Sequence, residues 1–410
     1  MGQAYAGPQL SSSTAVESSA GEAPFKRPAA APVSRSAAEW AFLRERAREA
    51  PSDERAALID RIKLLIDQYP GSPEAPRAGR LLADLYRAQR EAPESLMALL
   101  SFLYSFPEDD GAAEAKATFL EWTREDAGGG VRAGLEGLGG GPDISRPLQS
   151  RLASLIVRVS SGPSARFLAG PALAASRRFL ERFPSYEEMS DVVESQARLY
   201  RAAGKREEAR LSYEELLGVY PRSRFGPAAL LGIADIDVRG HGWWWRVFHK
   251  GKWRDLGIRA IGALEDLLRM YPGDVADGAS ALELEVWIYS KCLHQYESAV
   301  AAERRLAKLA PKSPEALAAL ESAARMAHDR LKNYGLEISV RRQIADEFPR
   351  PSVAPAQLLA AAGLYSGELA DPKNAQKLLN EVADKYPHGA AARKARKMLK
   401  KLREEMKNEK

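Results

Sequence analysis

The stretch "YPGSPEAPRAGRLLADLY", residues 69–86, joins the end of one helix to the start of the next. An apolar helical pattern ends at Tyr69, and Pro70 then lacks the backbone donor that a continuing helix would need. After one glycine a Ser-Pro-Glu triplet follows, which has the order of an N-cap, a first-turn proline and an acid beside the positive end of a helix. The stretch therefore predicts two helices separated by a tight turn.

The same junction recurs along the chain. An aromatic or apolar residue precedes proline at Tyr69-Pro70, Phe106-Pro107, Phe183-Pro184, Tyr220-Pro221, Tyr271-Pro272, Ala310-Pro311, Phe348-Pro349 and Tyr386-Pro387. The intervals are 37, 77, 37, 51, 39, 38 and 38 residues. We interpret 77 as two periods with one marker lost, at Arg146-Pro147, and 51 as one period with about 13 extra residues. The sequence is therefore an internal repeat with one insertion.

Each period has the composition of a helix, a turn and a second helix. The segments after the prolines carry an early Ser and continue as small-residue-rich helices, as in "RSRFGPAALLGIADI" (222–236) and "KSPEALAALESAARMA" (312–327). Apolar residues recur at spacings of three and four, for example at Ile258, Ile261 and Leu264, and sustained alternation of apolar and polar residues is absent. The sequence therefore predicts an all-α protein.

This arrangement resembles the tetratricopeptide repeat family. Counted back from the proline, that family has a small residue twelve positions earlier, a bulky one eight earlier and an aromatic about twenty-one earlier, and here these positions hold Ala209, Ala260, Ala299 and Ala375; Tyr213, Leu264, Leu379 and Leu99; and Tyr86 and Tyr200. The small residue lets the two helices of a repeat approach closely. The resemblance covers most of residues 38–390 and implies a right-handed superhelical α-solenoid of about nine helix-turn-helix repeats.

Two features depart from that family. The period of 37 to 39 residues exceeds the family's usual value of about 34. The segment "AGGGVRAGLEGLGGGPD" is rich in glycine, which is a poor helix former. It predicts a Gly-rich break at 127–143, between N-terminal repeats at 38–126 and C-terminal repeats at 144–387.

The long period and the "YPxS" junctions are similar to the divergent repeats of bacterial cell-envelope proteins, namely outer-membrane assembly lipoproteins and the periplasmic accessory protein of the Tol-Pal system. The lipoprotein pattern also needs a cysteine near the start, which this sequence lacks. The letters "AYA" at residues 4–6 have the small-x-small form of a signal-peptidase site. The resemblance implies a periplasmic or envelope-associated protein, with a cytoplasmic location as the alternative.

The two ends of the chain differ from the repeats in composition. Residues 1–37 are rich in Ala, Ser, Pro and Gly, which predicts a disordered leader or tether. Residues 388–410 keep apolar residues at helical spacing and have nine Lys or Arg against three Glu, which predicts a basic capping helix. Because the net charge of the whole chain is only +5, nucleic acid is a disfavoured partner.

The sequence contains no recognisable reactive constellation. It lacks phosphate-loop, serine-hydrolase and zinc-protease motifs, its five histidines are scattered, and its one cysteine, Cys292, lies in an apolar helical pattern. Glu-Ser pairs, which supply the acid in helical lytic transglycosylases, occur inside repeat helices at Glu194-Ser195, Glu297-Ser298 and Glu321-Ser322. We predict a non-catalytic protein-interaction scaffold without metal, cofactor or small-molecule substrate. The alternative is a helical support domain of an enzyme, for example a peptidoglycan-active one.

The interval of 51 residues contains the insertion "RGHGWWWRVFHKGKW", residues 239–253, between the two helices of its repeat. It predicts a docking loop within 239–254 that consists of Trp243, Trp244, Trp245, Arg246, Phe248, Lys250, Lys252 and Trp253. Three environments fit these side chains: the apolar flank of neighbouring repeats, the apolar groove of a protein partner, and the headgroup layer of a membrane. With the concave groove that the resemblance implies, this loop is the predicted contact with partner proteins.

Overall fold

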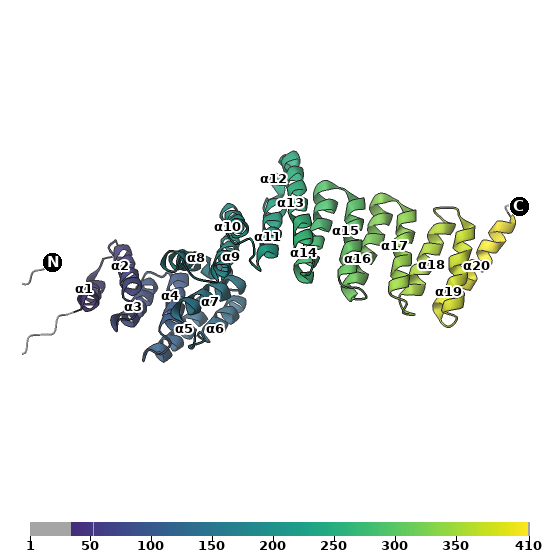
Figure 1. The fold of residues 1–410 in the computed structure, drawn as a ribbon. Coiled ribbons are helices and arrows are strands. Elements are labelled where there is room, and N and C mark those ends of the chain that lie inside the picture. Colours follow the sequence, from purple (N-terminus) through teal and green to yellow (C-terminus); the bar gives the residue numbers. More distant parts are fainter. Residues whose placement is uncertain (1–33, 52, 409–410) are drawn as a thin grey trace, which may run out of the picture. The chain divides into compact units, whose positions relative to one another are not determined.

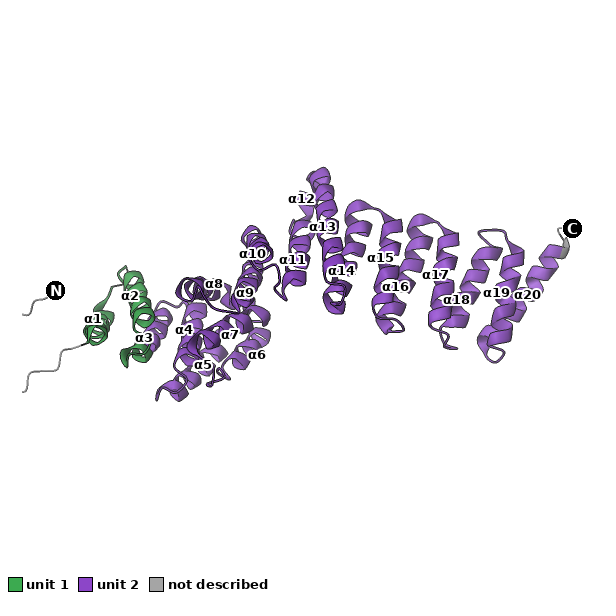
Figure 2. Cartoon of the chain, in the orientation of Figure 1, with its two compact units in different colours: residues 1–78 green, residues 79–410 purple. Residues whose placement is uncertain are grey.

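The computed structural model describes residues 34–51 and 53–408. Within these residues the chain forms twenty α-helices, two π-helical segments and no strand (Figure 1). None of the described helices is both long and apolar enough to cross a lipid bilayer. The chain divides into two compact units, residues 1–78 and residues 79–410 (Figure 2).

The first unit contains α1 (Arg35–Glu49), α2 (Arg55–Gln68) and the start of α3 (Glu74–Ala88). The Ser34 hydroxyl caps α1 by accepting a hydrogen bond of 3.2 Å from the backbone amide of Ala37. The first helix therefore begins three residues before the boundary predicted at residue 38. The rest of the predicted leader, residues 1–33, lies outside the described part of the chain.

In the second unit, each helix from α4 to α20 packs against the next, with α11 packing directly on α13. The bounds are α4 (Ala92–Ser105), α5 (Ala112–Asp126), α6 (Gly129–Leu138), α7 (Leu148–Ser161), α8 (Ala165–Arg182), α9 (Met189–Ala202), α10 (Arg206–Val219), α11 (Gly226–Arg239), α12 (Trp243–Phe248), α13 (Lys250–Met270), α14 (Val275–Trp287), η1 (Ile288–Leu293), α15 (Tyr296–Leu309), α16 (Pro314–Met326), η2 (Ala327–Leu331), α17 (Tyr334–Glu347), α18 (Ala354–Ser366), α19 (Pro372–Lys385) and α20 (Ala390–Asn408). In chain order, α1 to α19 give nine helix pairs with α12 as an extra helix. The predicted all-α class and the solenoid of helix pairs are confirmed.

Every proline junction lies at the end of the second helix of a pair. The residue before the proline is the C-cap in all eight cases: Tyr69, Phe106, Phe183, Tyr220, Tyr271, Ala310, Phe348 and Tyr386. The proline ring excludes the preceding residue from helical conformation, so the helix must end there. The four alanines of the repeat pattern are buried between helices: Ala209, Ala260, Ala299 and Ala375.

The predicted Gly-rich break at 127–143 is instead mostly helical. Its residues Gly129–Leu138 form α6, which packs against α5 and α7 and buries Leu135. From α7, Arg158 donates a hydrogen bond of 2.6 Å to the carbonyl oxygen of Gly137, near the end of α6. These tertiary contacts outweigh the low helix propensity of glycine.

The interval of 77 residues holds two helix pairs, α5 with α6 and α7 with α8. Pro147, which the sequence pattern predicts at the end of a helix, is instead the N-cap of α7. Proline is tolerated at a helix start because the first amides of a helix have no intrahelical acceptor. The repeat count is therefore unchanged, while α6 ends without a proline, at Leu138.

Ion pairs join neighbouring repeats of the second unit. Arg201 of α9 lies 2.7 Å from Asp235 of α11, and Arg305 of α15 lies 2.7 Å from Glu265 of α13. Arg305 also lies 3.3 Å from Glu285, whose side chain on α14 is fully buried. Arg201 and Asp235 are 34 residues apart in sequence, and Arg305 and Glu265 are 40 residues apart. Each separation is close to the length of one repeat, so these ion pairs join equivalent parts of neighbouring repeats.

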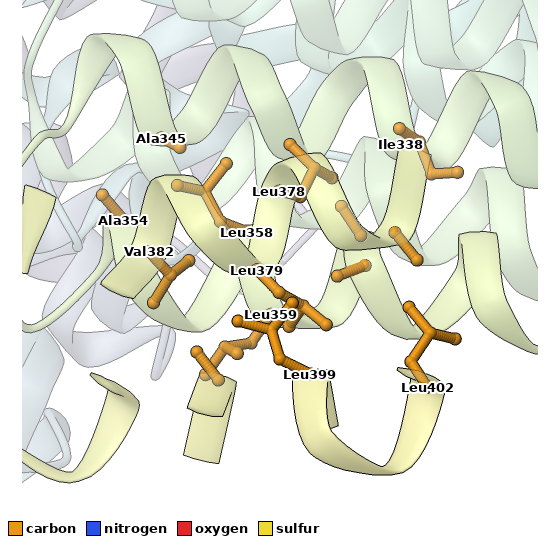
Figure 3. Close-up of a cluster of buried hydrophobic side chains, with 14 residues drawn as sticks. Ile338, Ala345, Ala354, Leu358, Leu359, Leu378, Leu379, Val382, Leu399 and Leu402 are labelled. Atoms are coloured by element: carbon orange, nitrogen blue, oxygen red, sulfur yellow. The ribbon is translucent and has the colours of Figure 1, made fainter. Parts of the chain in front are cut away.

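The last helix, α20, covers the final helix pair. Its Leu399 and Leu402 are 7% and 6% exposed and join a buried cluster with Leu379 and Val382 of α19 (Figure 3). The lysines and arginines of α20 between positions 393 and 403 are all exposed. The helix thus buries an apolar stripe and presents cations, as the end of a solenoid requires.

Candidate docking surface

The insertion at 239–254, predicted as a loop, is helical along most of its length. Its tryptophan triplet begins α12, and the residues from Lys250 onward extend the N-terminal end of α13. The second helix of this pair has 21 residues, against 14 in α11 and in α15. Seven extra residues lengthen a helix by about 10 Å. α12 lies beside this extended end of α13 (Figure 1).

One side of α12 is exposed and aromatic. Trp243, Trp244 and Phe248 are 64%, 66% and 72% exposed, and Val247 between them is 38% exposed. The rings of Trp243 and Trp244 meet edge to face at 4.5 Å, and Trp244 stacks on Phe248 at 6.0 Å. Residues four apart share a helix face, which places these four side chains together. We call Trp243, Trp244, Val247 and Phe248 the aromatic face.

The other side of α12 faces the protein. Trp245 stacks on His241 at 3.8 Å and on His249 at 4.9 Å. Partial burial lowers the pKa of His241, and the nearby cations Arg206 and Arg246 lower it further. The His241 ring is therefore kept neutral, as an apolar stacking partner of Trp245. The indole of Trp245 belongs to the packing of α12 and not to the aromatic face.

Arg246 and Trp253 fasten α12 and α13 to the neighbouring helices. The guanidinium of Arg246 lies over the rings of Trp253 and Trp287, at 5.5 Å and 5.7 Å from their centroids. Trp253 donates a hydrogen bond of 3.1 Å from its indole to the carbonyl oxygen of Val238, at the end of α11. Arg246 and Trp253, predicted as docking residues, therefore hold the insertion against the neighbouring helices. We call Arg246, Trp253 and Trp287 the mount.

Close packing between α13 and η1 supports this mount. A Cβ atom at Gly257 would lie 2.7 Å from the sulfur of Cys292, so only glycine fits without a shift. The Cys292 thiol donates to the carbonyl oxygen of Trp253 at 3.2 Å, and burial raises the pKa of Cys292 to about 11. The sole cysteine is therefore a protonated packing residue, as its apolar surroundings in the sequence predict.

Three exposed cations follow the aromatic face in the sequence. Lys250, Lys252 and Arg254 are exposed on the first turns of α13, where the first turn contains no acid. Within the described residues, no acidic side chain lies within ion-pair distance of them, and the nearest acid in sequence is the exposed Asp255. Cations at the positive end of a helix cost about 0.3 kcal/mol or more each. This charge is therefore unfavourable for the isolated helix and favours an external anion.

A cleft of about 510 Å³ lies beside α12, between α10, α11 and α13. His241 and Trp245 contribute one wall. The charged residues that line it are Arg206, Arg210, Lys252, Arg259, Glu207, Asp237 and Asp255. Arg210 is already paired with Asp237 at 3.3 Å and with Glu214 at 3.2 Å. The cations and acids nearly balance, so the cleft has no marked preference for an anion or a cation.

Of the three Glu-Ser pairs in the sequence, the pair in α9 is buried. Glu194 and Ser195 are 2% and 0% exposed inside α9, and the Glu194 carboxylate is paired with Arg198 one turn later. Burial raises the pKa of Glu194, while the Arg198 guanidinium opposes this shift. Within the described residues, no group of three or more His, Cys, Asp or Glu is placed to hold a metal ion.

The structure thus separates the eight predicted docking residues by their surroundings. Trp243, Trp244, Phe248 and Lys250 are on the outer surface, whereas Trp245, Arg246 and Trp253 pack inward and the exposed Lys252 lines the cleft beside Trp245. Sequence reasoning missed Val247, although helical spacing from Trp243 would have placed it on the aromatic face. It also missed Trp287, whose part in the mount depends on a contact between helices far apart in sequence.

One segment of the chain matches a known family model. The family model of the tetratricopeptide repeat matches residues 195–223, which cover the second half of α9, α10 and the following turn. No curated protein sequence matches this chain.

Three solved structures are similar to this chain. A tetratricopeptide repeat protein from Parabacteroides merdae is 13% identical, with 78% of this chain and 97% of that chain covered and a TM-score of 0.29. The structure of Naa15/Naa10 bound to HypK-THB is 15% identical, with 88% of this chain and 54% of that chain covered and a TM-score of 0.35. The structure of the APC/C hetero-tetramer Cut9-Hcn1 is 14% identical, with 90% of this chain and 83% of that chain covered and a TM-score of 0.27. The match at 195–223 and the nine helix pairs support the tetratricopeptide repeat as the unit from which this chain is built.

Proposed function

We propose that this chain is a non-catalytic scaffold that binds other proteins. The observation that carries the proposal is the run of helix pairs itself, in which small and apolar residues are buried between helices. The outward faces of those helices remain free for recognition, as in other repeat solenoids. Ion pairs between repeats hold neighbouring faces at fixed spacing, and a pre-formed surface loses less entropy when it binds.

The insertion gives this scaffold a second docking surface, separate from the repeat faces. The aromatic face is large, apolar and exposed, and aromatic residues dominate the energetics of many interfaces. Its mount on Arg246, Trp253 and Trp287 holds it in place without using the exposed rings. One chain could therefore hold a partner on its repeats while it attaches elsewhere through α12.

We further propose that the scaffold works in a bacterial cell-envelope assembly, in the periplasm or associated with a membrane. The support is the long repeat period and the "YPxS" junctions. Fractionation of native cells tests it: the protein should be released with the periplasm or sediment with membranes. Recovery with the cytoplasmic fraction would contradict the envelope location while leaving the scaffold proposal intact.

Partner capture tests the scaffold. Tagged full-length protein is used as bait in extracts of the native organism, captured complexes are cross-linked, and cross-linked peptides are identified by mass spectrometry. We expect an enriched protein whose cross-links fall on exposed lysines of the repeats, such as Lys205, Lys308 and Lys377. The matched bait lacks residues 240–254 and should retain this protein. Enrichment no greater than with an unrelated repeat protein, or digestion of purified peptidoglycan by this chain, would contradict the proposal.

A further inference from the structure

We propose that the aromatic face of α12 and the three cations that follow it in the sequence bind an anionic membrane surface. This inference rests on the proposed second docking surface and names what that surface binds. Its components are the exposed rings of Trp243, Trp244 and Phe248 and the exposed cations at the start of α13. Indole and phenyl rings partition into the interface between headgroups and acyl chains, and lysine and arginine pair with lipid phosphates.

The cations distinguish a membrane from an apolar protein groove. A groove would accept the rings but would leave Lys250 and Arg254 without counter-charge, since neither has an acidic partner within the described residues, whereas Lys252 lines the cleft with three acids. An anionic lipid layer supplies that charge over a continuous surface, at about 1 kcal/mol for each cation near it. It also offsets the unfavourable position of these cations at the positive end of α13.

A second copy of this chain is a poorer occupant. Closed dimers bring the same patch of both subunits together around a two-fold axis. Such a contact would place two sets of three cations against each other, with only the exposed Asp255 nearby to compensate in each copy. A lipid surface carries the opposite charge and has no such conflict.

The geometry also suits insertion into the interface. The inner residues of α12 are held by Trp245 stacking on His241 and by Arg246 lying over Trp253. Because the mount uses side chains other than those of the aromatic face, the face can enter lipid without unfolding its support.

Vesicle flotation of the full-length protein tests the proposal. The probes are phosphatidylcholine vesicles with and without about 30% phosphatidylglycerol. We expect flotation with the anionic vesicles only, and weakening when salt is raised to about 0.5 M. Replacing Trp243, Trp244 and Phe248 together by Ser should reduce affinity at least about tenfold. The matched control replaces three exposed apolar residues elsewhere, Leu211, Val219 and Ile258, by Ser and should bind as the parent does.

A second variant separates ring insertion from charge attraction alone. Vesicles with acyl chains brominated near the headgroup quench tryptophans that enter the interface. The parent protein should lose fluorescence on binding, whereas the double variant Trp243→Phe and Trp244→Phe should still float but lose most of that quenching. Quenching that is equal in both proteins would contradict insertion through this face. Circular dichroism and thermal unfolding verify that each variant remains folded.

The possible outcomes separate the membrane inference from the scaffold. If the Ser variant loses vesicle binding but still captures the protein partner, both proposals stand. If the parent fails to bind anionic vesicles, or if the Ser variant binds them equally well, the membrane inference is wrong, whatever the capture result. If the Ser variant instead loses the captured protein while vesicle binding is unchanged, the aromatic face is a protein-binding surface. Loss of self-association would identify a second copy as its occupant.

Discussion

The helices α12 and α20 have similar chemistry and opposite exposure. The helix α20, and α12 together with the start of α13, combine apolar side chains with lysines and arginines, yet Leu399 and Leu402 of α20 are 7% and 6% exposed (Figure 3) while Trp243 and Trp244 of α12 are 64% and 66% exposed. The helix α20 lies against α19 and α18 and buries its apolar stripe there. The comparison teaches that a cationic, apolar helix becomes a cap where it covers a neighbouring pair, and a docking surface where its apolar side faces solvent.

Substitutions in the buried stripe of α20 should cause the largest loss of stability. Replacing Leu399 and Leu402 together by Ala removes buried methyl groups and leaves a cavity, so the local free energy of unfolding should fall by about 5 kcal/mol. Hydrogen exchange of the α18 to α20 amides measures it. The control Ile258→Ala, at a position 55% exposed, should change little. If the α20 variant exchanged as slowly as the parent, its apolar stripe would not be a core element.

Because the carboxyl group of Glu285 is buried, we expect the stability of the fold to depend on pH. The pKa of Glu285 is raised from 4.5 to about 7, mainly by burial and also by the nearby Glu265 carboxylate, while Arg305 opposes both effects. The folded chain therefore holds this proton more tightly than the unfolded chain, and stability should fall as pH rises from about 4.5 to about 7, by about 3 kcal/mol.

The substitution Glu285→Gln isolates that contribution. Chemical denaturation at about pH 5 and about pH 8 should show a smaller loss of stability in the Gln variant than in the parent. The difference between the two proteins, rather than either curve, is the relevant quantity, because other groups titrate in the same range. Equal slopes in both proteins would show that the Glu285 carboxyl is not the cause.

The mount itself can be loosened with a smaller effect. The substitution Gly257→Ala forces a methyl group against Cys292, and overpacking of this kind costs about 2 kcal/mol. On the same helix, a methyl group at Gly262 would have no neighbouring atom within 4 Å, so Gly262→Ala should raise stability by about 0.5 kcal/mol or more. Thermal unfolding of the two variants and the parent protein measures both effects. Equal effects would show that α13 does not depend on close contact with η1.

Substitutions in the aromatic face of α12 should cause the smallest change in stability. Replacing Trp243, Trp244 and Phe248 together by Ala should change the free energy of unfolding by no more than about 0.5 kcal/mol, since exposed side chains contribute little to folding. Buried aromatic residues would cost about 3 to 5 kcal/mol each on truncation. A triple variant that melts far below the parent would place the aromatic face in the core and remove the contrast with α20.

The fold could be predicted because its signals are local. A proline ends a helix through its own ring, and in several pairs an alanine twelve residues earlier, such as Ala209 and Ala260, marks the close contact between the helices, so the sequence alone locates most helices. The helix α6 could not be predicted this way. Its glycines disfavour a helix locally, and the contacts that hold it come from Arg158 and from packing between α5 and α7.

The candidate surface was only partly predictable. Composition identifies the segment, but the exposure of each tryptophan depends on which face of α12 it occupies. Trp245 and Arg246 fall on the inner face, where Trp245 stacks on His241 in the turn before α12 and Arg246 lies over Trp287 of α14. A helical wheel drawn on residues 243–248 would have grouped Trp243, Trp244 and Phe248, but a single sequence does not show that Trp287 packs against the insertion.

Hydrogen–deuterium exchange of the full-length protein, with and without phosphatidylglycerol vesicles, tests the central claim most directly. It compares α12 and α20 in one sample, because both carry cations that an anionic surface could attract. Slower exchange on vesicle addition should be confined to residues 243–254, with the amides of α20 unchanged. Protection of α20 alone, or no change within 243–254, would contradict the assignment of the aromatic face as the membrane-docking surface.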